Sequence, residues 1–250
     1  MKNNKRIVIV GATSAIAEHC ARLWIRNQAA HIILIGRDTN RVKRVATDLK
    51  VRNALTTIEM IQAEFLDPTS IQATVDSILS QGKVDIVLIA HGSLPHQTEC
   101  QNSLQTCRDA LEINSLSPVM FAEAFANGLA RFNYGTIAVI GSVAGDRGRK
   151  SNYVYGSAKG LVTRYVQGLQ HRFAGTGLKI VLIKPGPTDT PMTAHLKDEG
   201  TRLAPVNEVA ERIVNAVQNG RTTVYVPGKW QLIMWIIKHL PRSVFNKLNI

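Results

Sequence analysis

Short runs rich in Val and Ile alternate along the chain with longer segments in which apolar residues recur at helical spacing. Runs of this length, bounded by Gly, Pro or Asp, are typical of strands buried on both faces of a sheet. The pattern predicts seven strands, at Arg6–Val10, His31–Ile35, Ile58–Ala63, Val84–Ala90, Thr136–Ile140, Lys179–Ile183 and Thr222–Val226.

The segments between these runs predict helices, among them Ile16–Arg26, Leu104–Phe132, Tyr155–Phe173 and Asn207–Asn219. Strands that alternate with helices indicate an α/β fold with a parallel sheet covered on both faces. A chain of 250 residues holds one large domain and is too short for two ordinary enzyme domains. We therefore predict a single-domain, doubly wound, seven-stranded sheet of the Rossmann type over 1–228, followed by a distinct tail over 229–250.

The chain is strongly basic, with 30 Lys and Arg against 18 Asp and Glu and a formal net charge of +12. This balance favours an anionic partner, namely nucleic acid, anionic lipid or a phosphorylated ligand. Three cysteines without a CxxC pair indicate neither a disulfide framework nor a cysteine zinc site, and no metal site is expected. A reducing cytoplasm is the expected setting, because neither a signal peptide nor a spanning helix is apparent.

The first predicted strand runs into Gly11, and a helix follows. Such a turn aims backbone N–H groups and a helix N-terminus at an anion, and the Thr13 and Ser14 hydroxyls can also donate to phosphate. Ala15 stands where dinucleotide turns often carry glycine, so the motif alone is weak. An ordinary strand–helix turn is the alternative.

The second predicted strand ends in Gly36-Arg37-Asp38. In dinucleotide folds this point faces the adenosine ribose, where an Arg can accept a 2′-phosphate. Arg37 therefore favours NADP(H) over NAD(H), unless it is only a solvated surface charge. Asp38 is better placed to cap the next helix.

The strongest chemical signal is Tyr155-Gly-Ser-Ala-Lys159. Positions i and i+4 share one face of a helix, so the Tyr155 hydroxyl and the Lys159 ammonium are expected side by side. A nearby cation lowers the pKa of a tyrosine, which could then exchange a proton with a carbonyl or alcohol. Ser142, at the end of the fifth strand, can hold the substrate oxygen, and Asn114 can relay a proton through water.

The order of glycine turn, Asn114, Ser142 and Tyr155-x-x-x-Lys159 resembles the short-chain dehydrogenase/reductase family over roughly residues 5–228. The family implies NAD(P)-dependent hydride transfer between nicotinamide and a carbonyl or secondary alcohol. It implies that Tyr155 is the general acid or base, that Lys159 lowers its pKa and binds ribose, that Ser142 positions the carbonyl and that Asn114 orders a water relay.

The same resemblance implies a set of cofactor-binding residues that surrounds these four. They are Gly11, Thr13, Ser14, Ala15, Ile16 and Arg37, then Leu66 and Asp67 near adenine, Ala90 and Gly92 along the adenosine, and Pro185, Gly186, Thr188 and Thr190 around the nicotinamide, with Tyr155 and Lys159. Two features depart from the family pattern: only one glycine remains in the turn, and the Asn-Asn-Ala-Gly pattern after the fourth strand is Ile89-Ala90-His91-Gly92 here. His91 is expected to make a structural hydrogen bond, with a ligand-facing role as the alternative.

The segment after Gly228 carries four Lys or Arg, no acid, two Trp and several large aliphatic residues. It is too short to span a bilayer, and Pro241 is expected to separate two short helices. One interpretation is an interfacial anchor that meets anionic lipid at the inner face of the membrane. The alternative is a helix packed over the substrate cleft or in a dimer interface.

The glycine-poor turn and the tail together resemble a branch of the family that reduces a 2-keto-pentose carried on decaprenyl phosphate. The resulting hypothesis is a reductase of a lipid-linked keto-sugar. The alternatives are a soluble reductase of 3-oxoacyl or other small carbonyl compounds, a sugar epimerase, and a non-catalytic fold that binds anions or nucleic acid. No nucleic-acid motif is present, so no nucleic-acid partner is expected, and the family resemblance implies a homodimer or homotetramer.

Overall fold

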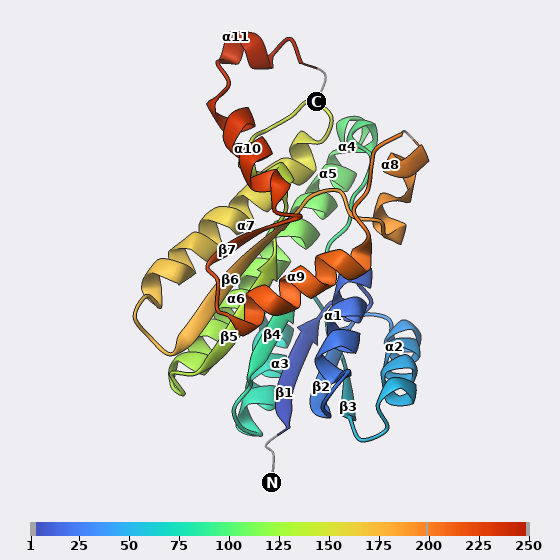
Figure 1. Ribbon diagram of the computed structural model, residues 1–250, viewed down its shortest axis with the longest axis vertical. Helices are drawn as coiled ribbons and strands as arrows, with labels where there is room; N and C mark the ends of the chain where they lie inside the picture. Colours follow the sequence, from blue (N-terminus) through green and yellow to red (C-terminus); the bar gives the residue numbers. More distant parts are fainter. Residues whose placement is uncertain (1–3, 199, 249–250) are drawn as a thin grey trace.

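The computed structural model describes residues 4–198 and 200–248 and contains one seven-stranded sheet (Figure 1). All strand pairs are parallel, and the order across the sheet is β3-β2-β1-β4-β5-β6-β7. The strands are β1 (Lys5–Val10), β2 (Ala30–Gly36), β3 (Thr57–Gln62), β4 (Ile86–Ile89), β5 (Gly135–Ile140), β6 (Leu178–Pro185) and β7 (Thr223–Val226). The predicted Rossmann-type fold is thus confirmed, and β4 is shorter than the predicted run.

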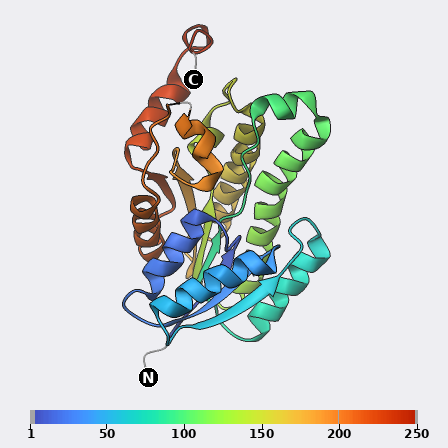
Figure 2. The ribbon, with the colours of Figure 1, turned by 90° about the vertical axis from the view of Figure 1, so that its right-hand side faces the viewer.

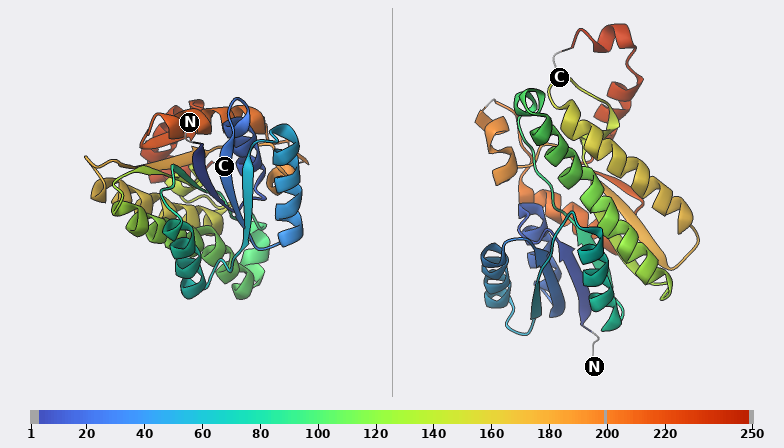
Figure 3. Two further views of the ribbon diagram at one scale, coloured as in Figure 1. Left: turned by 90° about the horizontal axis from the view of Figure 1, so that it is seen from below. Right: turned by 180° about the vertical axis from the view of Figure 1, so that it is seen from behind.

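Two layers of helices enclose the sheet, as the view from below shows (Figure 3). One layer holds α3 (Pro68–Ser80), α6 (Ser117–Ala130) and α7 (Tyr153–Arg172), and the other holds α1 (Ala15–Ile25), α2 (Thr39–Arg52) and α9 (Val206–Gln218). Each layer buries its own apolar cluster against one face of the sheet. The central strands therefore contact apolar side chains on both faces, which explains their nearly unbroken Val and Ile content.

The predicted helix Leu104–Phe132 is wrong as a single element. The structure has α4 (Gln97–Asn102), α5 (Leu104–Leu111), a π-helical turn η1 (Glu112–Leu116) and then α6. The π turn inserts an extra residue into the helix and contains Asn114. The helix predicted from Tyr155 likewise begins earlier, at Tyr153.

Several shorter elements lie between the strands and in the tail. They are the 3-10 turns η2 (Val143–Asp146) and η3 (Pro191–Thr193), the short helix α8 (Ala194–Asp198), and the tail helices α10 (Lys229–His239) and α11 (Arg242–Phe245). Pro241 separates the two tail helices, as predicted. The tail lies beyond the carboxyl ends of the strands, on the same side as α8 (Figures 1 and 2). Across residues 4–198 and 200–248, no helix is long and apolar enough to cross a membrane.

Candidate active site

The carboxyl ends of the central strands meet at one edge of the sheet. Val10 at the end of β1 pairs with Ile35 of β2 and Ile89 of β4, and Ile140 of β5 pairs with Ile183 of β6. The segments that follow these strands therefore begin next to one another. Nearly all the predicted site residues lie on these segments or on the helices that follow them. In open parallel sheets this edge is where ligands bind.

Asn114 is brought to this edge by the π turn. Its Oδ1 accepts from the Ser93 N–H at 2.9 Å, and its Nδ2 donates to the Ala110 carbonyl at 2.8 Å. The bond to Ser93 ties the helix to the loop after β4, and the bond to Ala110 lies within the helix. A Cβ added at Gly92 would lie 2.6 Å from Asn114 Oδ1 and 3.7 Å from Lys159 Nζ, so only glycine fits between them.

Lys159 and Ser142 meet at the end of β5. The buried Lys159 Nζ donates to the Ile140 carbonyl at 3.1 Å and lies 5.8 Å from the Tyr155 ring centroid. Ser142 caps η2 by accepting from the Ala144 N–H at 3.1 Å. Asn114, Ser142, Tyr155 and Lys159, which we call the tyrosine cluster, are thus assembled from three separate segments.

The electrostatics of the cluster correct one prediction. Burial raises the pKa of Tyr155, and the smaller effect of the Ser142 hydroxyl acts in the opposite direction. Burial also lowers the pKa of Lys159 to about 8. The expectation of a tyrosine pKa lowered by a nearby cation is therefore wrong for the protein alone, because burial disfavours the charged form of both groups.

His91 has the structural role that was expected. Its ring lies among Phe65 and Phe121, with centroid distances of 4.7 and 5.8 Å, and its Nε2 pairs with the Ser117 hydroxyl at 2.8 Å. Burial and the nearby cations Lys159 and Arg37 lower the pKa of His91 to about 3, so the ring is neutral.

The turn after β1 has the form of an anion cradle. Gly11 has φ of +80°, and a Cβ there would lie 2.6 Å from that of His91, so this glycine is required. Ser14 is the N-cap of α1 but makes no side-chain cap bond. No hydrogen bond within the described chain uses the Thr13 hydroxyl either. Together with the first-turn N–H groups of α1 at Ala15 and Ile16, these groups fit a dinucleotide phosphate.

The residues predicted to meet the adenosine lie at the ends of β2, β3 and β4. Arg37 is exposed, and its guanidinium lies 5.8 Å from the Phe65 ring centroid. Asp38 caps α2 by accepting from the Arg41 N–H, as expected, and Asp67 caps α3 by accepting from the Ser70 N–H. Ala90 is buried beside β1, and Leu66 is exposed.

The predicted nicotinamide frame follows β6 and contacts the tail. Thr188 donates to the Gly186 carbonyl at 2.9 Å, and Thr190 pairs with Thr193. Pro185 ends the strand and pairs with Val226 of β7. The Trp230 indole lies against Gly186 so closely that a Cβ there would overlap it. The tail is thus in contact with this loop.

Sequence reasoning missed a buried group next to the cluster. Asp146 pairs with Lys184 and accepts from the Tyr225 hydroxyl at 2.7 Å. Burial and this bond raise the pKa of Tyr225. The group joins the loop after β5 to β6 and β7. No local motif marks it, because its three members are far apart in the sequence.

Two further contacts between distant segments surround the site. Arg147 donates to the Ile237 and Leu240 carbonyls at the end of α10, the latter at 2.9 Å, and stacks 3.7 Å from the Phe245 ring centroid. We call this contact the Arg147 clasp. The second contact joins the loop after β4 to α8. The ring centroids of His96 and His195 lie 4.5 Å apart.

Comparisons with known proteins agree with this geometry. The family model described as short chain dehydrogenase matches residues 5–200. An uncharacterized oxidoreductase of Streptomyces coelicolor is 28% identical, over 98% of this chain and 96% of that protein.

Solved structures share the fold at low identity. A short chain dehydrogenase from Burkholderia cenocepacia in complex with NADP has a TM-score of 0.82 at 15% identity, covering 99% of this chain and 98% of that one. A short-chain dehydrogenase from Sphingobium yanoikuyae in complex with NADPH has a TM-score of 0.80 at 19% identity, covering 95% and 97%. With the family model matching most of its length, the chain belongs to the short-chain dehydrogenase/reductase family and is an NAD(P)-dependent oxidoreductase.

Proposed function

We propose that the chain is an NADP(H)-dependent reductase in which the tyrosine cluster acts on a carbonyl group of an amphiphilic substrate. The observation that supports this proposal most strongly is the cluster itself. Asn114, Ser142 and the Tyr155–Lys159 pair come from three segments and converge at the carboxyl edge of the sheet.

A bound nicotinamide supplies the hydride in reduction and accepts it in oxidation. Tyr155 donates a proton to the substrate oxygen in reduction, and its raised pKa keeps the hydroxyl protonated at neutral pH. Ser142 hydrogen-bonds the substrate oxygen and opposes the rise in the tyrosine pKa. The Lys159 ammonium stabilises the phenolate that remains after proton transfer, since its Nζ is 5.8 Å from the ring centroid.

Asn114 completes the path by which the tyrosine regains its proton. It lies against Gly92 opposite the Lys159 ammonium, at the boundary between the cluster and the loop after β4. In our proposal it orders a water that carries protons between Lys159 and solvent.

The cofactor proposal places the dinucleotide phosphates at the turn 11–16 and the nicotinamide at 185–190. The exposed Arg37 accepts a 2′-phosphate, and the neighbouring Asp38 carboxylate is already occupied as a helix cap. This arrangement favours NADP(H) over NAD(H). The NADP and NADPH complexes of structurally similar proteins agree with it.

The substrate proposal rests on the tail. A lipid-linked keto-sugar, such as one carried on polyprenyl phosphate, would suit a site next to a segment that is both basic and apolar. Leu232, Trp235 and Ile236 are exposed on α10, and no acidic residue occurs in 229–248. We propose that this surface makes peripheral contact with anionic membranes at the cytoplasmic face. We further propose a homodimer or homotetramer, which light scattering would test.

The test of the proposed chemistry is Tyr155→Phe against Tyr165→Phe, a variant on the same helix whose hydroxyl bonds Glu123 instead. Loss of general acid catalysis should reduce turnover of a keto substrate by about 10²–10⁴-fold. NADPH affinity should change less than threefold, as measured by fluorescence titration. Turnover of Tyr155→Phe equal to that of Tyr165→Phe would remove Tyr155 from the chemistry.

A further inference from the structure

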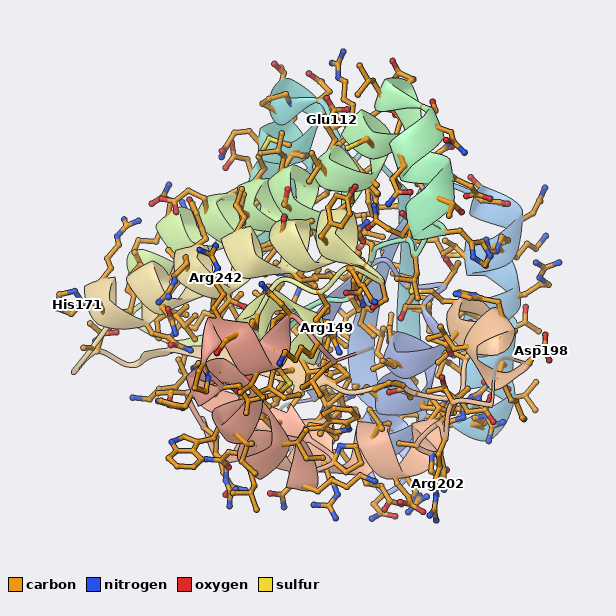
Figure 4. The ribbon with its side chains drawn as sticks, turned by 90° about the horizontal axis from the view of Figure 1, so that it is seen from above. Glu112, Arg149, His171, Asp198, Arg202 and Arg242 are labelled. Atoms are coloured by element: carbon orange, nitrogen blue, oxygen red, sulfur yellow. The ribbon has the colours of Figure 1, made fainter. Side chains whose placement is uncertain are left out.

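A cavity of about 370 Å³ lies between the loop that follows Ser142 and the end of the tail. Its lining combines cations, an amide and aromatic or aliphatic walls: Gly148, Arg149, Lys150, Tyr153, Phe245, Asn246 and Leu248. None of these residues belongs to the tyrosine cluster or to the predicted cofactor set. In the view from above, Arg149 and Arg242 lie on the side of the molecule where the tail meets α7 (Figure 4).

The positive charge of this cavity has no partner within the described chain. Arg149 is half-buried, and its Nε is buried without a hydrogen-bond partner. Neither Arg149 nor Lys150 forms an ion pair with a described residue. The neighbouring acid, Asp146, is already paired with Lys184 and Tyr225. An unpartnered buried guanidinium nitrogen is costly unless water or a ligand supplies the acceptor.

The N-terminus of α7 adds to the positive potential. This helix has 20 residues, and its N-cap, Asn152, makes no side-chain cap bond. The Val154 N–H is satisfied by Gln97 Oε1 at 3.1 Å, so only the other first-turn N–H groups add a partial positive charge beside Tyr153, which lines the cavity.

We propose that this cavity binds the phosphate group of the substrate, a phosphate ester with an apolar chain. Arg149 and Lys150 supply the charge, and both residues line the cavity. Phe245 and Leu248 form apolar walls at the tail, and Val244 continues the apolar surface outside. This inference rests on the proposed reductase function and extends it by assigning the site of the anionic group.

The cavity and the tyrosine cluster are carried by the same two segments of the chain. The loop that carries Arg149 continues from Ser142 through η2, and Tyr153 lies on the first turn of α7, the helix that carries Tyr155 and Lys159. Tyr153 and Tyr155 point to different faces of this helix, so the apolar chain or sugar of the substrate has to extend around its N-terminus to reach the cluster. The tail completes the cavity because the Arg147 clasp holds Phe245 in place.

The test measures binding of hexyl phosphate, with inorganic phosphate and hexanol as comparison ligands. ³¹P NMR follows the two phosphates, calorimetry follows all three, and saturating NADP⁺ occupies the nucleotide phosphate site. Arg149→Met should raise the Kd for hexyl phosphate at least tenfold, and the exposed Lys150→Met should raise it at least threefold. Arg164→Met, an exposed charge loss further along α7, should leave it unchanged. If Arg149→Met does not fold, the Kd of Lys150→Met for hexyl phosphate still tests whether this cavity binds the phosphate.

In the native protein hexyl phosphate should bind tighter than inorganic phosphate or hexanol. Equal affinity for the two phosphates would indicate a free phosphate site, and equal affinity for hexanol an apolar groove; either result would overturn the proposal. Unchanged affinity in both Arg149→Met and Lys150→Met would also overturn it. Tyr155→Phe should retain hexyl phosphate binding, so a failure here is distinguishable from a failure of the proposed chemistry, which would appear as retained turnover.

Discussion

Asn114 and Lys159 of the tyrosine cluster are 0% and 3% exposed, whereas Leu232 and Trp235 of the tail are 64% and 60% exposed. The cluster is positioned by the ends of paired strands and by hydrogen bonds to backbone groups on neighbouring segments. The tail is attached through Trp230, the buried Met234 and the Arg147 clasp. The two regions should therefore respond separately to substitution, because in the described part of the chain the tail contacts the loop after β6 at Gly186 and none of the four cluster residues.

The largest effect should come from removing the buried cation of the cluster. Lys159→Met eliminates the charge that we propose stabilises the tyrosine phenolate, and it should reduce turnover by about 10²-fold or more. The tail should be unaffected, so amide hydrogen exchange in α10 should match that of the native protein. Turnover within fivefold of native would contradict the role of Lys159.

The pH dependence of turnover provides a second test of the role of Lys159. The pKa of Lys159 is lowered to about 8, so the ammonium is present below this pH and is lost above it. Reduction rates should therefore fall as pH rises through about 8. This limb should be absent from the residual activity of Lys159→Met, and an identical limb in both proteins would assign it to another group.

Cofactor selection should show the next effect. Arg37→Asp replaces the proposed partner of the 2′-phosphate by a negative charge that repels the phosphate. The change should weaken NADPH binding by about ten- to 100-fold, which corresponds to one lost charge-assisted contact. NADH binding should change much less. Arg44→Asp, an exposed change on α2, is the matched control. Equal weakening of both cofactors would remove Arg37 from the phosphate site.

Breaking the Arg147 clasp should loosen the tail alone. Arg147→Met removes hydrogen bonds from a charged donor to the α10 carbonyls, a loss of roughly 1.5–3 kcal/mol in the local opening free energy of the tail. Hydrogen exchange should rise in α10 and stay unchanged in β4 and β5. Uniform acceleration across the sheet would show instead that Arg147 stabilises the whole domain.

Substitutions on the exposed face of α10 should have the smallest effect on the stability of the fold. The double substitution Leu232→Ser with Trp235→Ser changes residues that contribute little to the core, so the melting temperature should shift only slightly. Co-sedimentation with vesicles containing anionic lipid should fall several-fold. If the native protein does not bind such vesicles, the proposed membrane contact is wrong.

The sequence predicted the sheet well because buried parallel strands leave a strong local pattern. The seven Val- and Ile-rich runs correspond to β1 to β7 with boundaries that differ by at most two residues. The spacing of Tyr155 and Lys159 was equally readable, since both residues lie on one helix. Local periodicity is sufficient in both cases.

Features that depend on distant contacts could not be predicted in this way. The π turn at Asn114 is fixed by packing against Gly92 and Ser93, and a helical pattern does not reveal it. The raised pKa of Tyr155 depends on how deeply the folded chain buries it. The Asp146–Lys184–Tyr225 group and the Arg147 clasp join segments that only the tertiary structure brings together.

The central claim is that a turn with a single glycine still binds a nicotinamide dinucleotide beside the tyrosine cluster. Fluorescence titration of the purified protein with NADPH and with NADH tests it most directly. We predict saturable binding of both at one site, with NADPH the tighter ligand. Saturation by neither nucleotide would contradict the account, because Gly11, Thr13 and Ser14 would then form an ordinary strand–helix turn.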